Sequence, residues 1–287
     1  CSSDDGGPVA TPGNTTNVAR AQVTLENPTP PPLPIYDLWA VGPEAVAACG
    51  DAGFAAIFEG AGWRMLNTGV AARLTAVWGT ALDDVYFAGD SGCLLHWNGT
   101  TLTTLDAGDD NWSDMWGDTA TGDVWLVAGS SVVRLSGTAT RRFTYPDIPS
   151  GAKNGIAGSA TDDVYVVGYS GTVTHWNGAT WTPLTTGLGT RTLNGVAVVD
   201  DEVFIAGDDG ELWRFDGATW SSFTAAGASS DNFNVVSGID SNRVFAFGQD
   251  RLMYRWNGTA WVDIADAYFP TTYSFLAACV TPNGSPV

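Results

Sequence analysis

The sequence is poor in positive charge. Lysine and arginine number 12 against 31 aspartate and glutamate residues, the formal net charge is −19, and Lys153 is the only lysine. A surface with this excess of negative charge repels phosphate backbones, which argues against nucleic acid as a partner. Long apolar runs are missing as well, since no stretch reaches the roughly 18 residues typical of a membrane-spanning helix.

Charged residues are scarce overall, whereas glycine and tryptophan are abundant. Only 15% of the 287 residues are charged, 44% are hydrophobic, and the chain contains 35 glycines and 13 tryptophans. This composition is too apolar for a disordered chain. Because strong helix formers are few and Val, Thr and Trp are frequent, it favours strands joined by tight turns.

One pattern recurs six times along the chain. A clear copy runs over 74–99 and contains Asp83-Asp84-Val85-Tyr86, followed by His96-Trp97-Asn98-Gly99. Equivalent positions, at intervals of 38 to 41 residues, are Ala40, Gly79, Gly117, Gly158, Val198 and Gly238. So regular a period over most of the chain indicates a repeat architecture.

Each copy holds four short strand-like segments separated by turn residues. The second segment is apolar on both faces, and its copies are 85–89, 124–129, 164–168, 203–207 and 244–248. A strand buried on both faces belongs to a sheet packed between two others. The third segment is followed by Asn98-Gly99, Asn177-Gly178, Asp216-Gly217 or Asn257-Gly258, pairs that favour two-residue hairpin turns.

Units of about 40 residues with four strands each, stacked radially, form a β-propeller. We therefore predict an all-β protein, a β-propeller with six full four-stranded blades. Most of the 13 tryptophans fall on recurring positions and are expected to pack between blades. The segment 273–278 matches a first strand, so it either closes the six-bladed ring or joins 18–26 in a partial seventh blade.

The unit resembles the propeller repeats of secreted and lipid-anchored bacterial proteins that read DVYAVG…G…HWNGTxW. The matching residues are Asp83-Asp84-Val85-Tyr86, His96-Trp97-Asn98-Gly99 and Asn257-Gly258-Thr259-Ala260-Trp261. The resemblance covers residues 36–261 and implies the fold. It implies no particular activity, because propellers host unrelated functions.

The chain begins with Cys1, followed by Ser2 and a small, polar stretch. Residues 1–34 hold seven of the 14 prolines and are expected to form a flexible tether, with a propeller domain over 35–287. A first Cys ahead of a polar tether resembles a mature bacterial lipoprotein whose signal peptide has been removed. The resemblance implies a lipid on Cys1 and a bacterial cell-envelope location, with Ser2 compatible with the outer membrane. The alternative is that Cys1 is incidental.

The two histidines, His96 and His175, occupy the same place in their repeats. Other copies have arginine there, namely Arg134, Arg214 and Arg255. The position therefore requires a polar group of either kind, and two histidines in separate repeats do not form a metal site. No Asp-x-Asp-x-Asp-Gly calcium loop occurs either, so no metal and no cofactor are expected.

Paired carboxylates are frequent, and they are Asp83-Asp84, Asp109-Asp110, Asp162-Asp163, Asp200-Asp201 and Asp208-Asp209. Three of these pairs precede the second strand, where aspartate accepts hydrogen bonds from backbone N–H groups in tight turns. The Asp-box turn of the sialidase family, Ser-x-Asp-x-Gly-x-x-Trp, is absent. Turn formation is the favoured interpretation, and a pair at hydrolytic spacing is the alternative.

The cysteines are Cys1, Cys49, Cys93 and Cys279. With a lipid on Cys1, at most one disulfide forms among the other three. Cys49 and Cys93 lie in neighbouring repeats, whereas Cys279 follows the closing segment and can reach the first blade. The sequence leaves these pairings and a fully reduced set open.

A polar residue stands near the start of every first strand: Tyr36, Thr75, Ser113, Asn154, Asn194 and Asn234. Because first strands line the channel of a propeller, we expect these residues to converge at its mouth as ligand contacts. Lys153, beside Asn154, is expected to face an acidic ligand or to pair with Asp114. The alternative is that water and neighbouring backbone satisfy these groups.

Two classes of function follow. The first is a non-catalytic cell-envelope lipoprotein whose propeller binds a protein or a glycan at the cell surface. The alternative is a carbohydrate-active or other hydrolytic enzyme with carboxylates at the channel mouth. The sequence has no histidine cluster, no Cys–His pair and no nucleophile motif, and this favours the binding module.

Overall fold

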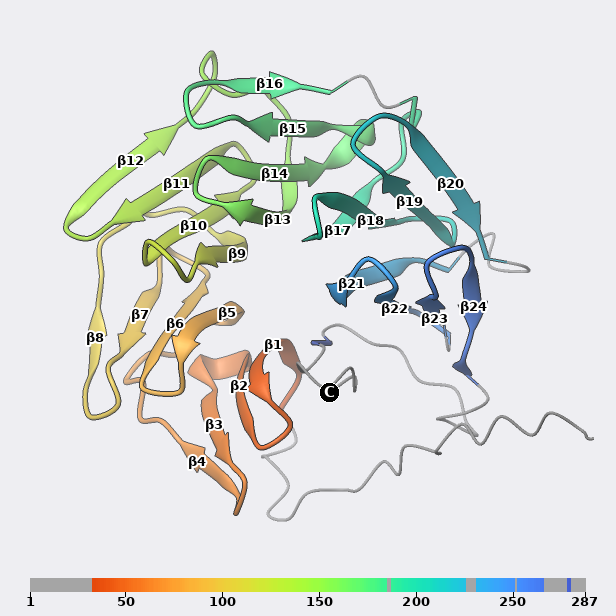
Figure 1. Cartoon of the computed structure of the whole chain (residues 1–287). Coiled ribbons are helices and arrows are strands. Elements are labelled where there is room, and N and C mark those ends of the chain that lie inside the picture. The colour runs from red at the N-terminus through yellow and green to blue at the C-terminus, as the bar shows by residue number, and fades with distance from the viewer. Residues whose placement is uncertain (1–32, 185–186, 226–230, 251, 266–277, 280–287) are drawn as a thin grey trace, which may run out of the picture.

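The computed structural model describes residues 33–184, 187–225, 231–250, 252–265 and 278–279. Within them, 24 strands form six four-stranded antiparallel sheets arranged radially around a channel (Figure 1). The predicted six-bladed β-propeller is confirmed. Nearly all of the predicted tether 1–34, the segment 18–26 and most of the closing segment 273–278 lie outside the described residues.

The strands of each blade pair in sequence order, with the first strand at the channel. Blade 1 consists of β1 (Ile35–Gly42), β2 (Ala45–Gly50), β3 (Ala55–Glu59) and β4 (Trp63–Met65). Blade 2 consists of β5 (Leu74–Ala81), β6 (Asp84–Gly89), β7 (Leu94–Trp97) and β8 (Leu102–Thr104). Blade 3 consists of β9 (Trp112–Asp118), β10 (Asp123–Ala128), β11 (Ser131–Ser136) and β12 (Ala139–Phe143).

The second half of the ring repeats this plan. Blade 4 consists of β13 (Lys153–Ala160), β14 (Asp163–Gly168), β15 (Val173–Trp176) and β16 (Trp181–Pro183). Blade 5 consists of β17 (Leu193–Val199), β18 (Glu202–Gly207), β19 (Glu211–Phe215) and β20 (Trp220–Thr224). Blade 6 consists of β21 (Phe233–Asp240), β22 (Arg243–Gly248), β23 (Met253–Trp256) and β24 (Trp261–Asp263).

The core lies between neighbouring blades. The second strands carry it, as their apolar sequences predict; all six residues of β10, for example, are buried. Tryptophans of three first strands each pack on a glycine of the next blade, and the pairs are Trp39 with Gly79, Trp78 with Gly117 and Trp116 with Gly158. A Cβ added at Gly117 would lie 2.5 Å from the Trp78 ring, so the repeat glycine makes room for the indole.

The turns after the third strands differ from the predicted two-residue hairpins. Trp97 pairs with Leu102, so this loop has four residues, 98–101. Asn98 Oδ1 accepts hydrogen bonds from the backbone N–H groups of Thr100 (3.1 Å) and Thr101 (2.8 Å). Equivalent bonds recur at Asn177, Asp216 and Asn257. The side chain caps a longer loop, and only the glycine takes a positive φ.

The possible disulfide of Cys49 with Cys93 or Cys279 is not formed, and these three cysteines have free thiols. Cys49 and Cys93 contribute to one apolar cluster at the interface of blades 1 and 2. Cys279 lies at the channel, where burial and the charge of Asp37 raise its pKa to about 12. The fully reduced alternative therefore describes these thiols, which pack as small apolar groups.

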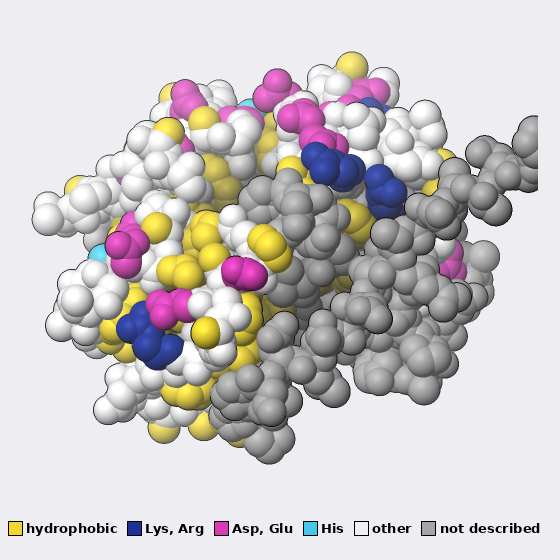
Figure 2. All heavy atoms as spheres, turned by 60° about the horizontal axis from the view of Figure 1, so that its bottom comes forward, with side chains coloured by type: hydrophobic (Ala, Val, Ile, Leu, Met, Phe, Trp, Pro, Cys, Tyr) yellow, Lys and Arg dark blue, Asp and Glu magenta, His cyan; other side chains and the backbone are white. Residues whose placement is uncertain are grey.

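Acidic side chains are spread over the surface, and the positive ones of the visible face lie in small groups beside them (Figure 2). Several arginines form ion pairs, such as Arg64 with Glu59 and Arg191 with Glu211. Across the described ranges, no helix is long and apolar enough to cross a bilayer.

Candidate functional site

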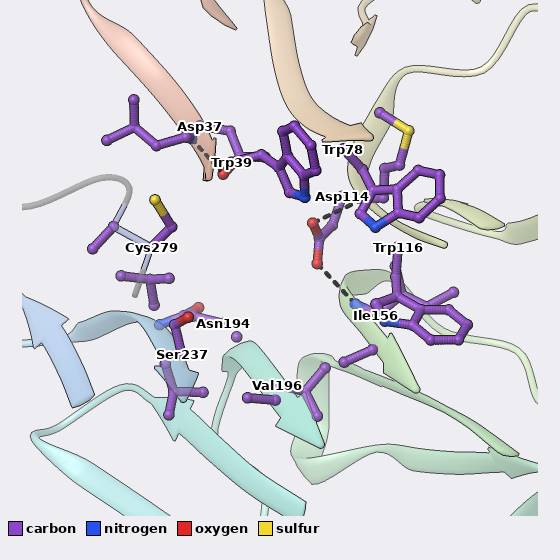
Figure 3. A pocket seen from close by; sticks show the side chains of 18 of the residues that line it. Asp37, Trp39, Trp78, Asp114, Trp116, Ile156, Asn194, Val196, Ser237 and Cys279 are labelled. Atoms are coloured by element: carbon purple, nitrogen blue, oxygen red, sulfur yellow. Dashed lines mark hydrogen bonds between the residues drawn. The ribbon is translucent and has the colours of Figure 1, made fainter. Parts of the chain in front are cut away.

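The six polar residues predicted at the starts of the first strands do converge. Tyr36, Thr75, Ser113, Asn154, Asn194 and Asn234 all line the central cavity, which has a volume of about 380 Å³ (Figure 3). Their positions around the channel are therefore as expected from the repeat. Whether they contact a ligand stays a prediction.

Four of these side chains bond to the next blade. The donors and acceptors are Thr75 Oγ1 and Trp112 O (2.6 Å), Ser113 Oγ and Lys153 O (3.1 Å), Asn154 Nδ2 and Leu193 O (2.9 Å), and Asn194 Nδ2 and Phe233 O (2.9 Å). Each acceptor is the carbonyl just before the next polar residue of the ring. We call these four side chains the polar belt. The polar belt connects blades 2 to 6. For its four residues, the alternative interpretation, in which neighbouring backbone groups are their partners, therefore holds.

Lys153 does not face the channel as expected. The residue is only 3% exposed, and its Nζ donates to the carbonyl oxygens of Pro149 (3.2 Å) and Gly151 (2.9 Å). It is not paired with Asp114, whose carboxylate accepts hydrogen bonds from backbone N–H groups. Burial lowers the pKa of Lys153, and the loop carbonyls compensate for the lost water.

Two channel carboxylates were missed by sequence reasoning. Asp37 accepts hydrogen bonds from the N–H groups of Leu38 (2.8 Å) and, in the next blade, Val77 (2.7 Å). Asp114 accepts equivalent bonds from Met115 (2.8 Å) and Ile156 (2.9 Å). The other blades have no carboxylate here, only Ala76, Gly155, Gly195 and Val235. The position therefore carries no periodic signal.

The environment of these two carboxyl groups favours their neutral forms. Desolvation raises the pKa of Asp37 to about 8, and the negative charge of Asp114 adds to the rise. Desolvation also raises the pKa of Asp114 to about 7. The backbone N–H groups oppose the rise at both residues, because they stabilise the carboxylate.

The cavity has one aromatic side. Trp39, Trp78 and Trp116 from blades 1 to 3 line it, and Figure 3 shows them across from Val196 and Ser237. Alanine or serine occupies the tryptophan position in blades 4 to 6. The tryptophans pack between blades as predicted, and they also give the channel its asymmetry.

The mouth of the channel forms a second pocket of about 430 Å³, which we call the mouth pocket. It is lined by Arg73, Asp90 and Asn111, together with all of the six polar first-strand residues except Asn154. Arg73 lies 3.2 Å from Asp90 and 5.4 Å from the Tyr36 ring centroid. The hydrogen bond and charge of Asp90 raise the pKa of Arg73. Sequence reasoning missed Arg73 and Asn111 because they lie in loops that vary between repeats.

The histidines have structural partners, as their repeat position predicts. His96 Nε2 lies 2.6 Å from Asp84 Oδ1, and His175 Nε2 lies 2.6 Å from Asp163 Oδ1. At the same position Arg134 pairs with Asp123. The Thr80 hydroxyl donates to Asp84 and not to His96, so no activated nucleophile results. No group of three or more metal-ligating side chains occurs among the described residues.

The paired aspartates before the second strands serve in turns or ion pairs. Asp200 and Asp201 take left-handed backbone conformations, with φ of 50° and 64°, between β17 and β18. Asp200 Oδ2 also accepts a hydrogen bond of 2.8 Å from the N–H of Ser241 in the next blade. This supports turn formation over hydrolysis at these positions.

Several solved structures share the fold. YCF48 bound to a D1 peptide superposes with a TM-score of 0.65, at 14% identity over 85% of this chain and 84% of that chain. The WD40 propeller of Doa1 superposes with a TM-score of 0.70, at 14% identity over 89% of this chain and 88% of that chain. The WD40 repeats of RRP9 superpose with a TM-score of 0.72, at 11% identity over 88% of this chain and 86% of that chain. No family model and no curated protein matches the sequence. At these identities the likeness shows the fold alone.

Proposed function

We propose that this chain is a non-catalytic protein-binding module that holds an extended peptide segment of its partner at the mouth pocket. The observation that carries the proposal is the exposed pair of Arg73 and Asp90, set beside the Tyr36 ring at the open end of the channel. This rim offers charge of both signs, amide groups and an aromatic ring. Such a mixture suits a peptide, whose backbone and side chains need both donors and acceptors.

The fold supports a protein partner. Among the structures that share it, YCF48 is bound to a peptide. The net charge of −19 attracts basic segments over a distance and increases their association rate. The partner segment therefore carries lysine or arginine for Asp90 and a carboxylate or carbonyl group for Arg73.

A glycan fits this pocket less well than a peptide does. Glycan recognition relies on an open aromatic face, but the Arg73 guanidinium lies over Tyr36 and Trp112 is only 1% exposed. Neither of the two rings that line the mouth pocket is therefore free for stacking.

The second candidate function is a hydrolytic enzyme that uses Asp37 and Asp114. The observation in its favour is that both carboxyl groups line the cavity and have raised pKa values, as groups in active sites often do. Against it, each carboxylate accepts two backbone hydrogen bonds in the same arrangement, one of them across a blade interface. An acid and a base need different environments, whereas these two positions serve the same structural purpose.

The proposal includes a lipid on Cys1 that holds the propeller at the bacterial outer membrane. Its support is the sequence, in which Cys1 precedes a proline-rich, polar segment ahead of the first blade. A tether of this length spans about 30–35 Å as a flexible coil, enough to lift the propeller clear of lipid headgroups.

The proposal is tested by affinity capture from an envelope extract with three immobilised forms of the chain. Wild type and Arg243→Ala are expected to retain the same protein, because Arg243 pairs with Asp240 away from the mouth pocket. Arg73→Ala is expected to lose that protein. Equal retention by all three forms, or no specific protein on wild type, contradicts the proposal.

A further inference from the structure

Tryptophan ends the third strand of every second blade, as Trp97 in β7, Trp176 in β15 and Trp256 in β23. Each of these tryptophans lies near residues of the fourth strand of the preceding blade, namely β4, β12 and β20. One position on that fourth strand is equivalent in all three, since it pairs with the third-strand position that His96 holds in its own blade; the partners are Ile57, Arg134 and Arg214. Its occupants are Arg64 in blade 1, Arg141 in blade 3 and Ser221 in blade 5.

Two of these interfaces place a guanidinium group on the tryptophan. Arg64 Cζ lies 4.9 Å from the ring centroid of Trp97. Arg141 Cζ lies 5.3 Å from that of Trp176, and 4.4 Å from that of Phe143. Arginine over an indole face is a favourable cation–π arrangement. The chain therefore uses the same contact twice to cover a tryptophan between blades.

The third interface lacks this arginine. Ser221 is too short to reach Trp256, and a pocket of about 300 Å³ lies between β20 and the β23–β24 hairpin. Its aromatic lining consists of Phe223, Trp256 and Trp261, and exposed Ser221 and Thr259 lie at its rim. We call it the outer pocket.

We propose that the outer pocket binds an arginine side chain of a partner protein, in the place that Arg64 and Arg141 hold at the other two interfaces. A planar guanidinium stacks on an indole better than a lysine ammonium does, and the net charge of −19 favours a basic partner. The inference goes beyond the proposed function, because the outer pocket shares no residue with the mouth pocket.

One lining residue, Arg214, is itself a cation, 5.3 Å from the Trp256 ring centroid. Its charge is compensated by Glu202, whose two oxygens lie 2.5 and 2.7 Å from the guanidinium. In blade 3 two guanidinium groups also lie close together, although on different rings, because Arg134 Cζ lies 5.4 Å from the ring centroid of Trp125 and Arg141 Cζ lies 5.3 Å from that of Trp176. There Arg134, paired with Asp123, lies directly across the strands from Arg141.

The test is an NMR titration of the full chain, observed at the tryptophan indole N–H groups, with N-acetyl-arginine amide as the probe. We expect the signals of Trp256 and Trp261 to shift. The uncharged N-acetyl-citrulline amide should bind at least tenfold more weakly. No shift, or equal binding of the two probes, overturns the proposal. So does a stronger response of the same signals to methyl glucoside, which would assign the pocket to a glycan.

Ser221→Arg copies blades 1 and 3 and should fill the pocket, weakening probe binding at least tenfold. Its matched control is Thr182→Arg, at the equivalent exposed position in blade 4, where the next blade has Phe215 in place of tryptophan. The control should bind the probe as wild type does. Unchanged binding by Ser221→Arg, or equal loss in both variants, contradicts the proposal.

A reverse experiment creates a second pocket. Arg64 is 43% exposed and its ion pair is with the exposed Glu59, so Arg64→Ser should fold normally. The probe should then shift the Trp97 indole signal in this variant and not in wild type. A Trp97 signal that does not respond in the variant refutes the equivalence on which the inference rests. Arg73→Ala should leave all these responses unchanged, which separates this site from the mouth pocket.

Discussion

The side-chain amide of Asn194 in blade 5 donates a 2.9 Å hydrogen bond to the carbonyl oxygen of Phe233, the first residue of β21 in blade 6. The same amide donates to Asp208 Oδ1, also at 2.9 Å. Both amide hydrogens are thus used within the protein. The polar belt therefore contributes to the stability of the ring at the site where a ligand was expected.

Asn194→Ala should lower the free energy of unfolding by about 1–2 kcal/mol, because it leaves the carbonyl of Phe233 without this partner. Urea denaturation measures the effect. Asn67→Ala, at an exposed loop position, serves as the control and should cost less than about 0.5 kcal/mol. A similar cost for both variants would argue against a structural role for the belt.

Gly117→Ala should destabilise the propeller by about 3 kcal/mol. The added Cβ would lie 2.5 Å from the Trp78 ring, and the indole is packed between two blades with little space to move. Gly129→Ala is the matched control in the same blade, since a Cβ there meets no atom within 4 Å. Thermal unfolding of both variants checks the prediction, which fails if their melting temperatures agree.

Stability should fall as the pH rises from about 4 to about 8. The folded chain holds Asp37 and Asp114 protonated, with pKa values of about 8 and about 7 instead of 3.8. The unfolded chain binds fewer protons over this range, so each group lowers stability by at most about 1.4 kcal/mol per pH unit while it is ionised in the unfolded chain and still protonated in the folded one.

Urea denaturation between pH 5 and pH 8 measures this slope. Asp114→Asn should flatten it, because the variant removes one titrating group and the negative charge that raises the pKa of Asp37. Asp147→Asn, at an exposed loop position, should leave the slope unchanged. An equal slope in wild type and Asp114→Asn shows that these carboxyl groups do not titrate as described.

Cys1→Ala should release the folded propeller from membranes, because it removes the residue that carries the proposed lipid. The measurement is fractionation of cells followed by a high-salt wash of the membrane pellet. Wild type is expected in the pellet and the variant in the soluble fraction. A variant that stays in the washed pellet, or a wild type that is never found there, refutes the anchor.

The sequence predicts the fold well because the fold repeats. Gly79 and its equivalents recur at a nearly constant interval, and they occupy equivalent places in the first strands of the structure. The six polar residues at the starts of the first strands were predictable for the same reason. Asp37 and Asp114 were not, because a residue found in only two of six repeats produces no period. Lys153 was misplaced because sequence cannot show that the loop carbonyls of Pro149 and Gly151 accept its hydrogen bonds.

Site-specific photocrosslinking in cells shows whether a protein partner binds at the channel mouth, as proposed. The photoreactive residue p-benzoylphenylalanine would replace Tyr36 in the mouth pocket, or Met65, which is 48% exposed on the outer strand β4, as the control. A discrete light-dependent protein adduct is expected from position 36 and none from position 65. No adduct at position 36, or the same adduct from both positions, would contradict the proposal.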